Sequence, residues 1–242
     1  MRKYFMTAFI LAGVLAIATS GLALEKVAAP MNADGRSDAW DAGSTCSVRY
    51  WNTCTGWVWV WGPWADGDVV GLVLEACCPQ GGVLDATSEY CWTGSLPGYG
   101  YTGTVEISTD NGSGCPGALI AQQSFLPASG WNTQLWGENV SGNVVLTVTH
   151  TNVNAGVIPD VITWASDHPA VGPTGPAACG FCYPTTRNAN SFYYGNTGTG
   201  TFCPGSPAYD GTCDSAWLWS GFFSCTISVE ETSWGAVKNL YR

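Results

Sequence analysis

Residues 105–151 read VEISTDNGSGCPGALIAQQSFLPASGWNTQLWGENVSGNVVLTVTHT, and extended runs alternate in them with short breaks. The extended runs fall at 105–109, 118–125, 131–136 and 144–151. The breaks are rich in Gly, Asn, Asp, Ser and Pro, which tolerate positive φ, bond their own backbone or fix a turn. This regular spacing of strands and turns predicts an all-β fold, a single antiparallel β-sandwich of jelly-roll type.

Segments on both sides of this region add further strands. The run WVWVW at 57–61 places three tryptophans on one face and two valines on the other. Residues 68–76 are almost continuously apolar, as in a strand buried on both faces, and 158–166 and 216–228 also read as strands. In contrast, 83–101 is rich in turn residues, and 170–209 carries so many Gly, Pro and Asn that we expect a surface excursion pinned by cystines.

The two ends of the chain differ from this β pattern. Residues 1–23 combine a basic start, an apolar run at 5–17 and a small-x-small site, which predicts a signal peptide. That apolar run is shorter than the roughly 20 residues of a spanning helix, so we expect no membrane span after signal cleavage. Residues 24–45 are expected to form a flexible N-terminal arm before a β-sandwich domain at 46–228.

Residues 229–242 predict a short amphipathic C-terminal helix. Trp234, Val237, Lys238 and Tyr241 recur at helical spacing, and Thr232 with Ser233 can cap its start. Two roles stay open for this tail: it packs back on the sandwich, or it serves as a sorting signal or partner-facing element.

The charge balance excludes some partners. Removing Arg2 and Lys3 with the signal peptide leaves 6 basic and 18 acidic residues, a net charge of −12. Nucleic acid and anionic membranes attract basic surfaces, so neither is an expected partner. A glycan or cell-surface partner remains compatible with this composition, and the oligomeric state cannot be read from it.

The eleven cysteines all lie in the part of the chain expected after export, where disulfides form by default. Because the count is odd, at least one thiol is free or pairs with another chain. Vicinal Cys77 and Cys78 are not expected to bond to each other, since such a bridge closes a strained ring. The disulfide candidates are Cys46, Cys54, Cys77, Cys78, Cys91, Cys115, Cys179, Cys182, Cys203, Cys213 and Cys225.

Motifs for catalysis or metal binding are absent from the sequence, so it assigns no catalytic residue, metal ligand or cofactor. Of two histidines, His150 reads as a sheet residue and His168 as a strand-end turn, and neither G-x-S-x-G nor H-E-x-x-H occurs. The C-x-x-C of Cys179 and Cys182 lies in a Gly-rich loop without a following helix, which favours a structural disulfide.

Acidic turns raise the question of calcium. Asp66-Gly67-Asp68, Asp110-Asn111 and Asp210-Gly211 with Asp214 place oxygens at turns, but none follows the regular calcium-loop spacing. Asp-Gly is also ordinary turn chemistry.

The high tryptophan content is the compositional feature that bears most directly on ligand binding. Trp57, Trp59 and Trp61 form a row that could stack against sugar rings if exposed, or fill the sandwich core if buried. We expect the core, and keep the row as the candidate ligand-binding residues should it be exposed.

Two stretches resemble exported bacterial proteins. Residues 105–121, VEISTDNGSGCPGALIA, resemble the I-x-x-D-N-G-G-x-P-G-x-x-L-A hairpin of jelly-roll domains that include the choice-of-anchor domains, with Cys115 as an insertion. The tail TSWGAVKNLYR at 232–242 is similar to short C-terminal tails of exported proteins. The resemblance covers about 28 residues and implies fold and export, with no catalytic residue to carry over.

Three functions are compatible with this sequence. The first is an exported, non-enzymatic structural or adhesive protein of the periplasm, cell surface or extracellular space. The second is a carbohydrate-binding module that uses tryptophan stacking. The third, a secreted hydrolase acting on glycosides, would need two acids about 5–10 Å apart across a cleft.

Overall fold

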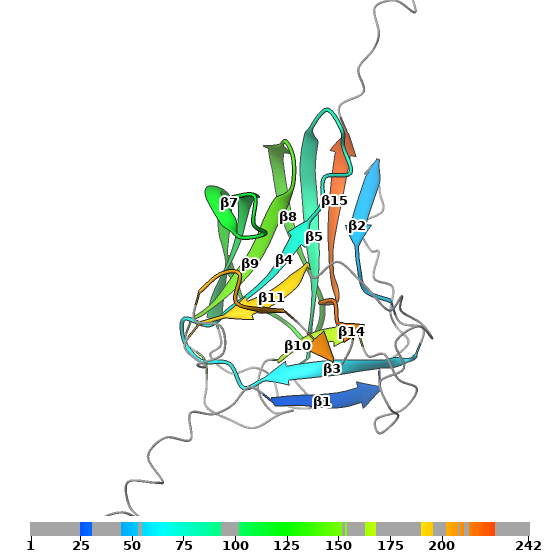
Figure 1. The fold of residues 1–242 in the computed structure, drawn as a ribbon, viewed down its shortest axis with the longest axis vertical. Coiled ribbons are helices and arrows are strands. Elements are labelled where there is room, and N and C mark those ends of the chain that lie inside the picture. The colour runs from blue at the N-terminus through cyan, green and yellow to red at the C-terminus, as the bar shows by residue number, and fades with distance from the viewer. Residues whose placement is uncertain are drawn as a thin grey trace, which may run out of the picture.

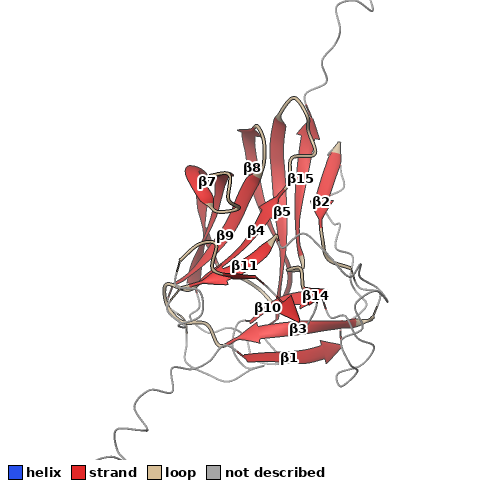
Figure 2. Cartoon of the chain, in the orientation of Figure 1, coloured by secondary structure: helices blue, strands red, loops and turns tan. Residues whose placement is uncertain are grey.

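The structure, a computed structural model, describes residues 25–30, 45–52, 55–92, 102–151, 153, 163–167, 190–195, 202–207, 209–210 and 213–225. All regular structure in these residues is β, as the sequence predicted, and Figure 2 shows strands and loops only. No helix of the described residues is long and apolar enough to cross a membrane. The strands are β1 (Glu25–Pro30), β2 (Cys46–Arg49), β3 (Trp57–Gly62), β4 (Val69–Leu74), β5 (Gly82–Trp92), β6 (Thr102–Asp110), β7 (Pro116–Phe125), β8 (Gly130–Val140), β9 (Val144–Thr151), β10 (Thr163–Asp167), β11 (Ser191–Tyr194), β12 (Ser206–Pro207), β13 (Tyr209–Asp210), β14 (Cys213–Asp214) and β15 (Trp219–Cys225).

The strands form two large antiparallel sheets. One has seven strands in the order β1-β3-β10-β5-β15-β2, with β8 also paired to β5. The other has six strands in the order β12-β11-β4-β9-β6-β7. In Figure 1, β1 and β3 run across the lower end of the molecule, whereas β5, β15 and β8 rise above them. β13 and β14 form a separate two-stranded hairpin.

The main core lies between the two large sheets. Leu72 and Leu146 contribute to it from the six-stranded sheet, and Leu84, Trp164 and Trp219 from the seven-stranded sheet, all fully buried. β4 is buried at every position, which confirms the prediction for most of 68–76, whereas Glu75 and Ala76 lie beyond the strand and are exposed. Burial of so much apolar and aromatic surface is the main favourable term that holds the two sheets together.

The turn-rich reading of 83–101 was wrong for its first half. Residues 82–92 form β5, which pairs with β8 on one edge and β15 on the other. Thr87, Ser88 and Glu89 are polar yet buried in this strand. A strand bonded on both edges inside a sheet can hold such polar residues, because β preference depends strongly on the sheet context.

Strand β8 is longer than the run predicted at 131–136. It continues through Gly137, whose φ of +71° suits glycine. The pairing with β5 shifts register at this point, between Leu84 and Ala86. A bulge therefore absorbs the break that the sequence suggested.

The expected arm at 24–45 begins with a strand instead. β1 pairs with β3 over its full length, from Glu25 opposite Gly62 to Pro30 opposite Trp57. Within the expected excursion at 170–209, β11 extends the six-stranded sheet at β4, and β12 pairs with β11. The predicted signal peptide at 1–23, the predicted C-terminal helix at 229–242 and His168 lie outside the described residues.

Candidate functional site

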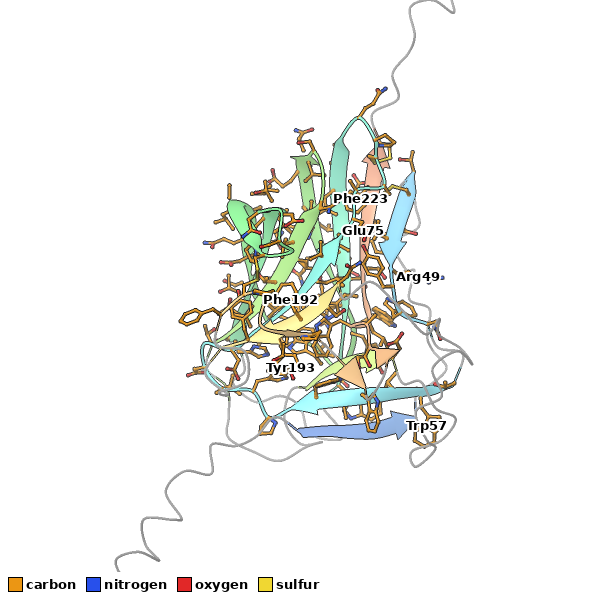
Figure 3. All side chains as sticks on the ribbon, viewed as in Figure 1. Arg49, Trp57, Glu75, Phe192, Tyr193 and Phe223 are labelled. Atoms are coloured by element: carbon orange, nitrogen blue, oxygen red, sulfur yellow. A yellow bond between two sulfur atoms is a disulfide. The ribbon has the colours of Figure 1, made fainter. Side chains whose placement is uncertain are left out.

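The three candidate tryptophans of β3 do not form an exposed row. Trp61 is 5% exposed, and its Nε1–H donates to Ser166 Oγ at 2.8 Å. Trp57 and Trp59 are half-buried, and Trp59 packs against the main core. Figure 3 shows Trp57 toward the right-hand end of β3, away from Phe192 and Tyr193. Of the three tryptophans, only Trp61 is buried.

A different aromatic group lies on the opposite face of the seven-stranded sheet. We call Arg49, Trp51, Tyr90 and Trp131 the outer aromatic cluster. Tyr90 of β5 and Trp131 of β8 are register partners, and their rings meet edge-on at 5.2 Å. Trp51, which follows β2, lies 5.4 Å from the Trp131 ring. Successive side chains of β5 point to opposite faces of the sheet, so Tyr90 lies on this face, whereas its neighbours Glu89 and Cys91 lie on the core face.

The outer aromatic cluster is accessible to solvent mainly at Trp131 and Arg49. Trp51 and Tyr90 are 7% and 8% exposed, whereas Trp131 is half-buried and Arg49 is exposed. The Arg49 guanidinium lies 5.0 Å from the centre of the Trp51 ring, in cation–π range. Trp51 Nε1–H donates to the Trp219 carbonyl at 3.0 Å, which fixes its ring. The cluster therefore offers a rigid aromatic edge beside a cation.

His150 is a buried structural residue, as its position in a predicted strand suggested. Trp164 Nε1–H donates to His150 Nε2 at 2.9 Å. An indole nitrogen only donates, so Nε2 is the acceptor and Nδ1 carries the proton, donating to the Asp68 carbonyl at 2.7 Å. Trp64 stacks on the ring at 4.9 Å. Burial lowers the pKa of His150 to about 4, so the ring is neutral at neutral pH.

Glu89 is a buried acidic residue that the sequence did not reveal. It is 0% exposed, and neither carboxylate oxygen has a hydrogen-bond partner among the described residues. Burial raises its pKa to about 8. Burial and the neighbouring Glu89 raise the pKa of the Cys91 thiol well above its usual value. Three successive polar residues, Thr87 to Glu89, hide the strand in the sequence, and no residue type marks Glu89 as buried.

In the acidic turns considered for calcium, aspartate carboxylates accept hydrogen bonds from backbone N–H groups. Asp66 Oδ1 accepts from the Val153 N–H at 2.7 Å, and Asp68 Oδ2 accepts from the Ala65 N–H at 2.7 Å. Asp110 Oδ1 accepts from the N–H groups of Gly112 and Gly114, each at 2.9 Å. These bonds give the carboxylates a turn-forming role. The side chains of Asp210 and Asp214 lie outside the described part of the chain.

Three disulfides occur among the described residues, as the sequence predicted for these six cysteines. They are Cys46–Cys77, Cys78–Cys225 and Cys115–Cys203, which indicate an extracellular or other oxidising compartment. Vicinal Cys77 and Cys78 bond to separate partners, as expected. Among the described residues Cys91 is a free, buried thiol, in line with the expectation of at least one unpaired cysteine. The sulfurs of Cys54, Cys179, Cys182 and Cys213 fall outside the description.

Comparison of the chain with protein-family models, with curated proteins and with solved structures finds no match in any of the three. The resemblance of residues 105–121 to jelly-roll hairpins, and that of the tail, therefore stay predictions.

Proposed function

We propose that this chain is an exported, non-enzymatic structural or adhesive β-sandwich protein of jelly-roll type, located in the periplasm, at the cell surface or outside the cell. The observation that carries the proposal is the structural use of three buried acid–base groups, His150, Asp68 and Asp167. His150 is committed through both ring nitrogens, and Asp68 supports a turn. Asp167, also buried, accepts from the backbone N–H of Asn52 at 3.1 Å and of Ala216 at 2.8 Å.

The disulfides support an exported role. Cys78–Cys225 and Cys115–Cys203 join residues separated by 147 and 88 positions. A cross-link that closes a long loop stabilises a fold by about 2–4 kcal/mol. Such a domain suits an oxidising compartment. The predicted signal peptide at 1–23 would direct the chain to export.

Localisation and attachment test this proposal together. Antibody accessibility and protease treatment of intact producing cells should place the chain outside the cytoplasm. Cells that lack the chain should attach more weakly to their substratum or show a weakened surface layer. A cytoplasmic chain, or a hydrolytic activity that disappears in Asp167→Asn while the fold is kept, would sink the proposal.

A second candidate function is carbohydrate binding by the outer aromatic cluster. Trp131 is half-buried and packs on Trp51, whose ring lies under the exposed Arg49. Sugar rings stack on such aromatic groups, while guanidinium donors bond their hydroxyls. The test is a glycan panel with two matched variants. Trp131→Ala should abolish binding and Trp57→Ala should retain it. The reverse result would return the site to β3, and no binding to any glycan would remove this candidate.

A further inference from the structure

Four cysteine side chains from three separate parts of the chain meet at one place. Cys46 lies in β2, Cys77 and Cys78 follow β4, and Cys225 ends β15. They form two disulfides, Cys46–Cys77 and Cys78–Cys225. The two bonds touch, because Cys46 Sγ lies 3.7 Å from Cys78 Sγ and 3.6 Å from Cys225 Sγ. We call these four residues the four-cysteine cluster.

The spacing of the sulfurs matches a metal–thiolate site. A tetrahedral zinc ion with Zn–S bonds of about 2.3 Å requires sulfurs about 3.8 Å apart. Cys46 Sγ already has this spacing to both neighbouring sulfurs, and the Sγ atoms of Cys46, Cys78 and Cys225 all lie within 4.8 Å of one another. If the Cys78–Cys225 bond is broken, its two sulfurs can move apart to the same spacing. The three Sγ atoms of Cys46, Cys78 and Cys225 then form one face of a tetrahedron around an ion.

The approach of Cys46 also argues against simple exchange between the two disulfides. Its sulfur is almost equally far from both sulfurs of the Cys78–Cys225 bond, so it faces that bond from the side. Thiol–disulfide exchange proceeds by attack in line with the bond that breaks. A side-on sulfur is poorly placed for that attack and well placed to share an ion.

We propose that the four-cysteine cluster is a redox-gated site for a soft divalent cation, with Zn²⁺ as the expected ion. In the oxidised state it holds two disulfides. In the reduced state Cys46, Cys77, Cys78 and Cys225 supply four thiolates to one ion. The two states exclude each other, so metal uptake would report a reducing environment.

The chemistry balances as two separate steps. An external thiol or phosphine reductant supplies two electrons to each disulfide, and two protons from solvent convert it to two thiols. The four thiols then lose four protons to solvent as one divalent cation binds, which leaves a complex of charge −2. Oxidation of the thiolates to the two disulfides releases the ion and returns four electrons to the oxidant.

The surroundings hold the cluster in place independently of the sulfur–sulfur bonds. Cys46 is the register partner of Phe223 in the β2–β15 pair, and the Gly81 N–H donates to the Cys78 carbonyl at 3.0 Å. At Gly82 a Cβ would lie 3.0 Å from Cys78 Sγ, so this glycine permits the close approach. Cys78 is 5% exposed and the other three are half-buried. Cys46 and Cys225 lie on paired strands, and shielded ligands of this kind suit a closed, structural type of site.

Cadmium is the probe for the test, since it binds thiolates as zinc does and reports its ligands. The full chain is reduced with a phosphine without oxygen, freed of reductant and titrated with Cd²⁺. We expect the sulfur-to-cadmium absorption band to rise until a tight site is filled and the ¹¹³Cd resonance to report four sulfur ligands. The oxidised chain should show neither signal.

Matched variants assign the site within a chain that has other cysteines. Cys46→Ser and Cys225→Ser should weaken Cd²⁺ binding by more than about 100-fold, since even outer-shell changes cost about 10- to 100-fold. Cys179→Ser and the pair Cys115→Ser with Cys203→Ser should leave the four-sulfur resonance unchanged. Circular dichroism of each variant in its oxidised state checks the β fold. A reduced chain without a four-sulfur resonance overturns the proposal, and so does one whose resonance survives Cys46→Ser or is lost in Cys179→Ser.

Discussion

At the scale of single residues, Glu89 is a side chain whose charged form the fold opposes. It lies in the core face of β5 without a bonding partner for either oxygen among the described residues. Its pKa is raised from 4.5 to about 8 by burial. Between these values the unfolded chain loses a proton that the folded chain keeps. The contribution of Glu89 to stability is therefore lost progressively as pH rises from 4.5 to about 8.

Replacement of Glu89 by its neutral isostere should remove this loss. Glu89→Gln should have nearly wild-type stability at about pH 5 and exceed it by about 2–4 kcal/mol at about pH 9, since one pKa unit corresponds to about 1.4 kcal/mol. Urea unfolding at both pH values measures the difference. Glu138→Gln on the neighbouring strand β8 is the control for the chemical change. Equal effects of Glu89→Gln at the two pH values would contradict the buried, protonated state.

At the scale of elements, β11 is held to β4 by an aromatic ring over a glycine. Phe192 and Gly71 are register partners, and a Cβ at Gly71 would lie 2.2 Å from Phe192 Cζ. Phe192 is 4% exposed and stacks on Tyr194 at 6.0 Å. The ring occupies the space that a side chain at Gly71 would need, so β11 docks only because this position is glycine.

This contact predicts a specific pairwise coupling. Gly71→Ala should destabilise the fold by about 1–3 kcal/mol through overpacking. The double variant with Phe192→Leu should be less unstable than the sum of the two single variants, by about 0.5–3 kcal/mol. Denaturant unfolding of the cycle measures this term. Phe125→Leu, in the main core on the other face of the sheet, should combine additively with Gly71→Ala, and equal coupling to both would refute the ring-over-glycine contact.

Elements with a strong apolar period could be predicted, and elements shaped by their neighbours could not. The tryptophan–valine alternation of β3 and the apolar run of β4 identified two strands directly. β5 was missed because its buried Thr87, Ser88 and Glu89 carry no apolar signal and gain their strand from pairing on both edges. The same limit applies to the outer aromatic cluster. Trp51, Tyr90 and Trp131 are distant in sequence, and only the sheet topology brings them together.

At the scale of the whole molecule, two buried groups with opposite pKa shifts shape the stability profile. Burial lowers the pKa of His150 from 6.5 to about 4, so its contribution to stability is lost as pH falls from 6.5 to about 4. The Glu89 contribution is lost as pH rises from 4.5 to about 8. Where the two ranges overlap, between pH 4.5 and 6.5, their slopes have opposite signs and cancel. The pair should therefore leave a plateau there, with a loss on each side.

Removing one member of this pair should expose the slope of the other. Between pH 4.5 and 6.5, His150→Asn should lose stability relative to wild type as pH rises, because the wild type has the opposing His150 term. Over the same range Glu89→Gln should gain stability relative to wild type, because it lacks the Glu89 loss. Each slope should approach about 1.4 kcal/mol per pH unit. Subtracting the wild-type unfolding free energy at each pH cancels the surface carboxylates, which all three chains share. Two difference curves of the same sign would show that these groups do not both stay uncharged in one core, because only a neutral His150 and a protonated Glu89 give slopes that diverge.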